Sequence, residues 1–226
     1  GDSILHHMFC AAWRARLGRD VDAFRRCRDE IVECLRRTQP LVAGIELNIS
    51  SPNTAGLRIF QEPGRLRGLI EGLVADKQVP LFVKLPPWPR DTDNRRDILK
   101  LAETAVDAGA DGLVIANTHP IESRRLKVGR GGLSGAPLFE HTELMIADIQ
   151  ALVQGNAAII ACGGVSTAEQ VWKLMASGAS AVQLYTSFIY EGPGLPSRLN
   201  HRLVKLMSVA GIETVADITG PPPTVK

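Results

Sequence analysis

The sequence predicts an α/β fold of the (β/α)8 barrel type, present as about five parallel strands and therefore incomplete. Short apolar strands alternate along the chain with amphipathic helices, an order typical of a parallel sheet covered by helices. Gly-Ala precedes a strand and Thr follows it at 109–118 and again at 178–186, so one supersecondary unit is reused. Polar residues gather after the strands, where barrels place their active sites.

A doubly wound sheet also carries its polar residues beyond the strand ends, so this rule alone does not choose between the two architectures. The length of 226 residues suits one domain. We expect a single barrel domain over residues 1–226 that lacks its first strands. Segment 1–20 is ambiguous, since it could be a strand leading into a turn or the start of a helix.

Hydrophobic periodicity defines the elements in chain order. Apolar residues recur at helical spacing over 21–38, which predicts an amphipathic helix, and an apolar strand over 41–49 follows. The Gly- and Arg-rich segment 118–137 is expected to be a long loop. The other expected strands are 80–85, 112–117, 157–162 and 181–185, and the other expected helices lie near 66–74, 98–106, 139–154, 167–177 and 196–209.

Composition bounds the function classes. A net charge of +2 without a long basic run does not suggest a nucleic-acid-binding protein. No apolar run approaches the roughly 18 residues that span a bilayer, and no signal-peptide pattern is present. Because no C-x-x-C pair occurs, we expect reduced thiols in an intracellular protein. The cysteines are Cys10, Cys27, Cys34 and Cys162.

The stretch 45–58 organises the chain, because a buried strand ends there in a cluster of amides and hydroxyls. Such groups are costly to bury unpaired but can orient a polar ligand. Taken alone, the stretch is more often a turn that caps the next helix. However, Asn48-Ile-Ser-Ser-Pro-Asn-Thr-Ala-Gly-Leu-Arg58 resembles the catalytic strand of the dihydroorotate dehydrogenases. Ser51 resembles their membrane-associated, quinone-reducing class, whereas the soluble class carries Cys at that position.

The resemblance extends from near residue 21 to about residue 220 and implies bound FMN. Lys84 ends an apolar strand, where it could extend to solvent or face an anion-accepting cofactor. The resemblance places this lysine against the flavin ring, where its charge would stabilise the anionic reduced form. Asn117 and Thr118 could form a turn, but the family's matching pair binds the substrate. Ala116 departs from the family's usual hydroxyl residue, so it would contact the flavin through its backbone.

Two loops follow the last two expected strands, the glycine loop at Gly163-Gly164 and the segment at Tyr185-Thr186. Such loops form the common phosphate site of barrels, because glycine lets backbone N–H groups approach an anion. In the family they hold the FMN phosphate. The Gly131-Gly-Leu-Ser-Gly135 segment resembles a family loop whose last glycine, Gly135, approaches the cofactor.

The reaction implied by the resemblance is the oxidation of dihydroorotate to orotate in pyrimidine biosynthesis. Ser51 would take the C5 proton, with Thr54 in the proton relay, while hydride moves from C6 to N5 of FMN. The electrons would then pass to a quinone. The substrate-binding set would be Asn48, Asn53, Asn117 and Thr118, with Asn48 also touching the cofactor.

Other interpretations remain open. The family's substrate-binding Lys, an Asn-rich segment and FMN contacts of the first barrel strands are not found upstream of Asn48, and the helices of the quinone tunnel are absent too. The chain could therefore be a non-catalytic or partner-dependent barrel fragment, or a phosphate-binding barrel enzyme without flavin. The flavoenzyme hypothesis predicts an intracellular location, cytoplasmic or peripheral on the inner membrane, with membrane contact through the absent N-terminal segment. The five histidines show no metal-ligand spacing, so no metal is expected.

Overall fold

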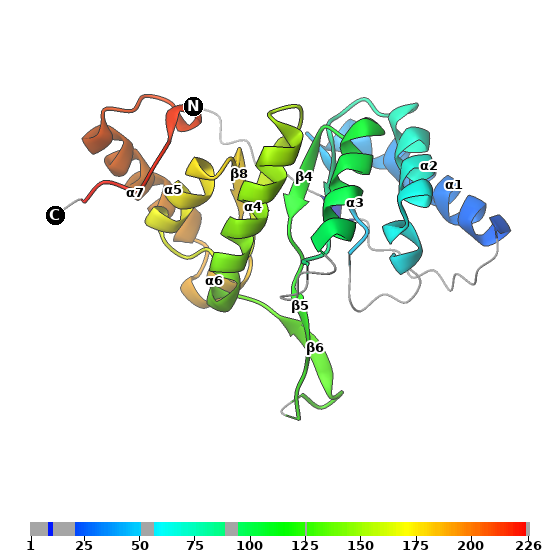
Figure 1. Cartoon of the computed structure of the whole chain (residues 1–226), viewed down its shortest axis with the longest axis horizontal. Helices are drawn as coiled ribbons and strands as arrows, with labels where there is room; N and C mark the ends of the chain where they lie inside the picture. Colours follow the sequence, from blue (N-terminus) through cyan, green and yellow to red (C-terminus); the bar gives the residue numbers. More distant parts are fainter. Residues whose placement is uncertain (1–8, 11–20, 51–56, 89–94, 125, 225–226) are drawn as a thin grey trace. The chain divides into compact units, whose positions relative to one another are not determined.

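The structure is a computed structural model that describes residues 9–10, 21–50, 57–88, 95–124 and 126–224. The chain divides into two compact units, one ending at Val114 and the other beginning at Ile115. Figure 1 colours the chain from blue at its N-terminus to red at its C-terminus. Each unit is a parallel α/β arrangement in itself.

The parallel strands of the first unit follow the order β1 (Phe9–Cys10), β2 (Ile45–Asn48), β3 (Leu81–Lys84) and β4 (Gly112–Ile115), and the last residue of β4 begins the second unit. Strand β2 pairs with β3 so that Ile45 lies opposite Leu81 and Asn48 lies opposite Lys84. The helices are α1 (Val21–Thr38), α2 (Pro63–Val74) and α3 (Arg95–Asp107), and α2 packs against both α1 and α3 (Figure 1). Short 3-10 turns occupy Gln39–Leu41 and Leu57–Gln61.

Alternating side chains give the sheet of the first unit two different faces. Leu81 and Val83 of β3 are buried, as are Ile45 and Leu47 of β2. Ile45, Leu47 and Leu81 line one pocket together with Leu73 of α2. Side chains of a strand alternate between faces, so Glu46 and Asn48 must share the opposite face. The hydrophobic core of this unit therefore lies between the sheet and its helices.

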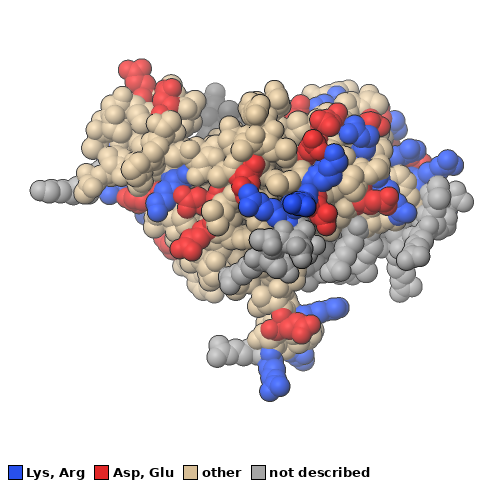
Figure 2. Space-filling view, in the orientation of Figure 1, with Lys and Arg blue, Asp and Glu red and all other residues tan. Residues whose placement is uncertain are grey.

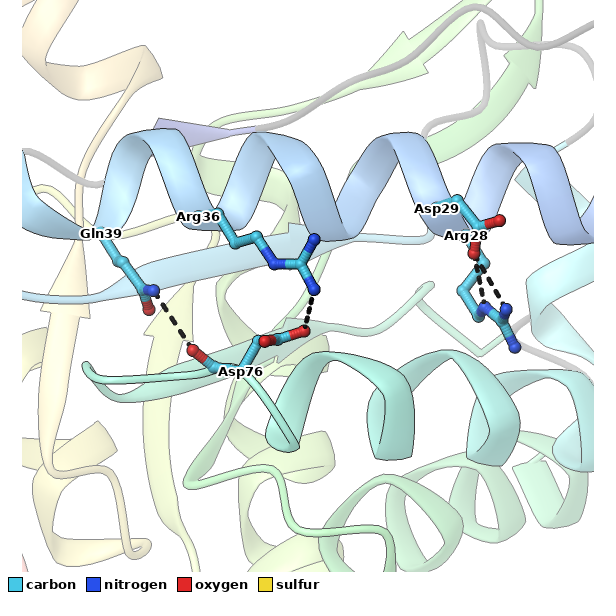
Figure 3. A network of polar contacts seen from close by, with 5 residues as sticks. All are labelled: Arg28, Asp29, Arg36, Gln39 and Asp76. Atoms are coloured by element: carbon cyan, nitrogen blue, oxygen red, sulfur yellow. Dashed lines mark hydrogen bonds and ion pairs between the residues drawn. The ribbon is translucent and has the colours of Figure 1, made fainter.

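A polar network joins the end of α1 to the turn after α2 (Figure 3). The buried side chain of Gln39 accepts a hydrogen bond from the backbone amide of Gln78 at 2.8 Å and donates one to the carbonyl of Asp76 at 3.2 Å. Arg36 pairs with the Asp76 carboxylate at 2.9 Å. Gln39 thus supplies the hydrogen bonds that the backbone of the α2–β3 turn needs. The Arg28–Asp29 pair in the same view is exposed and adds little.

The second unit contains β7 (Ala158–Cys162) and β8 (Ala181–Gln183), which are parallel, with Ile160 opposite Ala181. Its helices are α4 (Phe139–Val153), α5 (Ala168–Ala176), α6 (Thr186–Glu191) and α7 (Leu195–Ala210). Thr167 and Gln170 form a capping box at the start of α5. Buried Trp172 of α5 donates its indole N–H to the Gly220 carbonyl, which fastens the C-terminal segment.

An antiparallel hairpin, β5 (His119–Glu122) and β6 (Arg130–Leu133), extends from this unit (Figure 1). Its side chains alternate between half-buried and exposed, so one face packs while the other meets solvent. Figure 2 shows positive and negative side chains interspersed at the hairpin, which carries exposed Glu122 and Arg130. Turns Ala136–Leu138 and Val215–Asp217 are 3-10 helices.

The five expected strands and six expected helices are confirmed, and the helix at 21–38 has the expected bounds. The loop expected over 118–137 was wrong in part, because the β5–β6 hairpin lies within it. Helix α6 was not expected. The ambiguous segment 1–20 contributes β1, a two-residue strand paired with β2. In the described part of the chain, no helix has the length and apolar character needed to cross a membrane.

Candidate active site

Strand β2 ends in a polar turn that begins at Asn48. The Asn48 side-chain oxygen accepts hydrogen bonds from the amide and the hydroxyl of Ser50, both at 3.0 Å. Gln61 donates to the carbonyl of the intervening Ile49 at 3.1 Å. These bonds satisfy backbone groups beyond the strand end and hold the Asn48 amide in a fixed orientation.

Lys84 ends β3 directly opposite Asn48 and does not extend to solvent. Its side chain is 14% exposed, and its ammonium lies 3.5 Å from a carboxylate oxygen of Glu46. A buried ammonium requires an opposite charge or hydrogen bonds, and Glu46 supplies the charge. The end of β3 therefore presents a positively charged group beside the Asn48 amide.

The remaining candidates of the catalytic stretch lie outside the described residues. They are Ser51, Asn53 and Thr54. Their roles as base, substrate ligand and relay residue stay predictions. The described neighbours, Asn48 and Ser50, place the start of this stretch at the carboxyl end of β2.

In the second unit, Ala116 is buried, and its amide donates to the Cys162 carbonyl at 2.9 Å, next to the glycine loop after β7. The Asn117 side-chain oxygen accepts a hydrogen bond from the Thr118 amide at 2.8 Å. The Thr118 hydroxyl packs on Gly132 of β6, where a Cβ atom would lie 2.2 Å from it. The hairpin thus depends on glycine at this position to accommodate Thr118.

The glycine loop after β7 packs tightly against the start of α4. Gly163 and Gly164 have φ values of 141° and 79°, which L side chains rarely adopt. A Cβ atom at Gly164 would lie 2.4 Å from the amide nitrogen of Phe139, the first residue of α4. A Cβ atom at Gly163 would lie 2.7 Å from the Thr142 hydroxyl. Glycine is therefore required at both positions, because a side chain at either would collide with α4.

Three segments distant in sequence meet beside this loop. Gly135, with φ of 81°, lies so near Thr186 that a Cβ atom would be 3.0 Å from its methyl group. The Ser187 hydroxyl donates to the Val165 carbonyl at 2.6 Å, which joins the start of α6 to the glycine loop. Tyr185, which immediately precedes α6, is 76% exposed. The second unit thus brings Gly135, Gly163, Gly164 and Thr186 into one neighbourhood.

Both units place polar or glycine-rich segments immediately after the carboxyl ends of parallel strands that are covered by helices. This arrangement defines an α/β protein of parallel strands whose functional residues lie at the strand ends, as they do in (β/α) barrels and in doubly wound sheets. The family model for dihydroorotate dehydrogenase matches residues 17–207, and the chain belongs to that family.

Individual curated proteins and solved structures of this family are also similar to the chain. A dihydroorotate dehydrogenase (quinone) from Sphingopyxis alaskensis is 36% identical over 216 residues, covering 90% of this chain and 59% of the relative. The corresponding protein of Agrobacterium fabrum is 34% identical, covering 95% and 62%. The crystal structure of the Eimeria tenella enzyme in complex with ferulenol matches with a TM-score of 0.75 and 32% identity, covering 85% of this chain and 57% of that one.

These comparisons confirm the expected barrel fold class in partial form. They also show that the chain spans about 59% of the length of the Sphingopyxis relative. Sequence reasoning missed two residues of this neighbourhood, Glu46 and Ser187. Glu46 could have been found as a charged residue flanked by Ile45 and Leu47 in an apolar strand. No local pattern pointed to Ser187, because its hydrogen bond joins separate loops.

Proposed function

We propose that this chain carries the flavin- and substrate-binding strand ends of an enzyme that oxidises dihydroorotate to orotate. The observation that supports this best is Lys84, a charged side chain held at the end of β3 opposite Asn48. An ammonium of low exposure beside an amide suits an anion-accepting cofactor and a polar planar substrate. Membership of the dihydroorotate dehydrogenase family agrees with this chemistry.

The described residues fit FMN as the cofactor. Gly163 and Gly164 form a tight turn with positive φ after β7, and the contact between Gly135 and Thr186 lies near it. Successive backbone N–H groups in such a glycine turn can bind a phosphate group. The proposed cofactor-binding set is Asn48, Lys84, Ala116, Gly135, Gly163, Gly164, Tyr185 and Thr186.

When bound, FMN supplies the hydride acceptor of the reaction. Ser51 would accept the proton from C5 of dihydroorotate, and Thr54 would pass that proton on. A serine hydroxyl is a weak base in water, so this step requires a closed site and a fixed geometry. The amides of Asn48, Asn53 and Asn117 would orient the substrate ring, with Thr118 beside Asn117.

A quinone is the proposed electron acceptor, since the relatives named above are quinone-dependent and Ser51 matches their class. A second candidate is a barrel segment that becomes active only with a partner chain or further residues. The specific observation in its favour is length, because this chain covers 59% of one quinone-dependent relative and 62% of another.

The test measures FMN binding first and chemistry second. Purified protein is titrated with FMN, and flavin bleaching by dihydroorotate is then followed anaerobically. Ser51→Ala should keep FMN but reduce the bleaching rate about 10²- to 10⁴-fold, the usual contribution of a general base. Ser208→Ala, at an exposed position on α7, is the matched control and should behave as wild type.

Three results decide between the hypotheses. An unchanged bleaching rate in Ser51→Ala removes Ser51 from its role. Protein that binds FMN but is not bleached by dihydroorotate favours the partner-dependent segment. Protein that cannot be loaded with FMN at all overturns the flavoenzyme proposal.

A further inference from the structure

Glu46 is an unusual residue for its position. It lies in the middle of β2, between two buried aliphatic residues, and only 4% of it is exposed. Carboxylates are almost never buried this deeply unless an opposite charge or hydrogen bonds compensate them. A valine or isoleucine would fill a buried strand position without this cost, so the carboxylate requires a reason.

The strand register supplies that reason. Glu46 and Asn48 are two residues apart in β2 and therefore point to the same face of the sheet. Lys84 lies opposite Asn48, so its side chain also starts on that face. The ammonium reaches back along the sheet to Glu46, 3.5 Å away, rather than outward to solvent. Glu46 thus pairs with the Lys84 ammonium from a position one side-chain step earlier in β2 than Asn48.

We propose that Glu46 is a positioning residue that fixes where the Lys84 ammonium lies on this face of the sheet, beside the end of β3. The carboxylate touches neither substrate nor cofactor in this role; it acts through Lys84. The part of this inference that concerns FMN rests on the proposed function. The ion pair itself does not, so it can be tested without any cofactor.

A buried ion pair responds to mutation in a recognisable way. Removing one charge of a buried pair is strongly destabilising, because the other charge loses its counter-charge. Removing both charges with residues of similar volume is often neutral. Glu46→Gln and Lys84→Met should each lower the urea midpoint of the apo protein, and the double variant should recover most of that loss.

Two readouts separate positioning from a merely structural role. In protein labelled with ¹³C-lysine, the Lys84 pKa measured by NMR without FMN should fall in Glu46→Gln, because the opposite charge is gone. FMN affinity should fall about tenfold in Glu46→Gln, but by less than about twofold when Glu46→Gln is added to Lys84→Met. Glu46→Asp keeps the carboxylate on a shorter side chain, so its Lys84 pKa and its FMN affinity should lie between those of Glu46→Gln and wild type.

Glu103→Gln is the matched control. It removes the carboxylate of an exposed ion pair, Lys100–Glu103 at 2.6 Å, in the same unit. The midpoint and the Lys84 pKa should both stay at the wild-type value, since exposed pairs contribute little.

Two results would overturn the role of Glu46. One is a Lys84 pKa that is unchanged in Glu46→Gln. The other is a loss of FMN affinity on Glu46→Gln that is as large in the Lys84→Met protein as in wild type. If Glu46→Gln does not fold, a double variant that folds supports the inference and one that also fails to fold contradicts it. If no variant, wild type included, binds FMN, the proposed function fails while the pKa and midpoint arms still decide the role of Glu46.

Discussion

Replacing Gly164 by alanine tests whether the glycine loop after β7 is built around close backbone packing. Gly164 has φ of 79°, and a Cβ atom there would lie 2.4 Å from the Phe139 nitrogen and 2.6 Å from its Cα. Those atoms belong to the start of α4, so they cannot rotate away as a flexible side chain could. Either the loop or the helix end must shift.

The expected magnitude follows from a comparison with Gly155, in the turn between α4 and β7. Gly155 has φ of 83° but no atom within 4 Å of its Cβ position. Gly155→Ala should therefore cost only the conformational term, about 1–2 kcal/mol. Gly164→Ala should cost that term plus overpacking of about 1–3 kcal/mol, so about 2–5 kcal/mol in total.

Urea unfolding of the two variants beside wild type measures this difference, read as midpoints with the slope held in common. Equal midpoints for Gly164→Ala and Gly155→Ala would refute the reasoning, because the contact with Phe139 would then carry no cost. If the loop also holds the FMN phosphate, Gly164→Ala should lose FMN affinity while Gly155→Ala keeps it.

Three further predictions concern groups away from the site. Burial, with a smaller contribution from Glu30, raises the pKa of the Cys27 thiol to about 11, so a thiol reagent at pH 8 should label Cys27 only after unfolding. A thiol pKa that is higher in the folded than in the unfolded protein stabilises the fold below the unfolded-state pKa, and this stabilisation is lost as pH rises. The urea midpoint of wild type should therefore fall between about pH 9 and 11 more steeply than that of Cys27→Ala. A hydrogen bond from its own backbone amide lowers the pKa of Glu169, and the hydrogen bond and charge of Arg202 lower it further by a smaller amount. A lowered carboxyl pKa stabilises the folded protein above the unfolded-state pKa, and this stabilisation is lost as pH falls through the folded-state pKa. Glu169→Gln should therefore make the free energy of unfolding fall less steeply at acid pH. The difference should be about 1 kcal/mol at most, because the Glu169–Arg202 pair is exposed. Gln39→Leu should cost about 1–3 kcal/mol because it strands the Gln78 amide and the Asp76 carbonyl, whereas Gln78→Ala keeps its own backbone bond and should match wild type in urea unfolding.

The elements that sequence reasoning found share one property, an uninterrupted signal within a short window. Helix α1 has a regular apolar stripe, and β4 and β7 are nearly all apolar. The β5–β6 hairpin lacks such a signal, since Pro120 lies in one strand and Gly131 and Gly132 in the other. Its pairing depends on contacts across the turn, such as Thr118 on Gly132, which propensity alone does not reveal.

The sequence could indicate which residues lie at strand ends, but it could not indicate which of them contact one another. Asn48, Lys84 and Asn117 could be named because each ends an apolar run. The approach of Gly135 to Thr186, and the bond from Ser187 to Val165, join segments whose proximity follows only from tertiary packing. Glu46 was overlooked for a related reason, because its partner lies on the neighbouring strand and appears only once the register is known.

The register of β2 against β3 also bears on the choice between a barrel and a doubly wound sheet, which the sequence left open. In a doubly wound sheet helices cover both faces, so both faces are apolar. In the first unit, α1, α2 and α3 pack in a row, and the apolar side chains of Ile45, Leu47, Leu81 and Val83 face that layer. The opposite face carries Phe82 together with Glu46, Asn48 and Lys84, and a second helical layer would have to desolvate the last three. Helices on one side of a parallel sheet, with the other face turned toward an enclosed axis and the site at the strand ends, are the arrangement of a barrel.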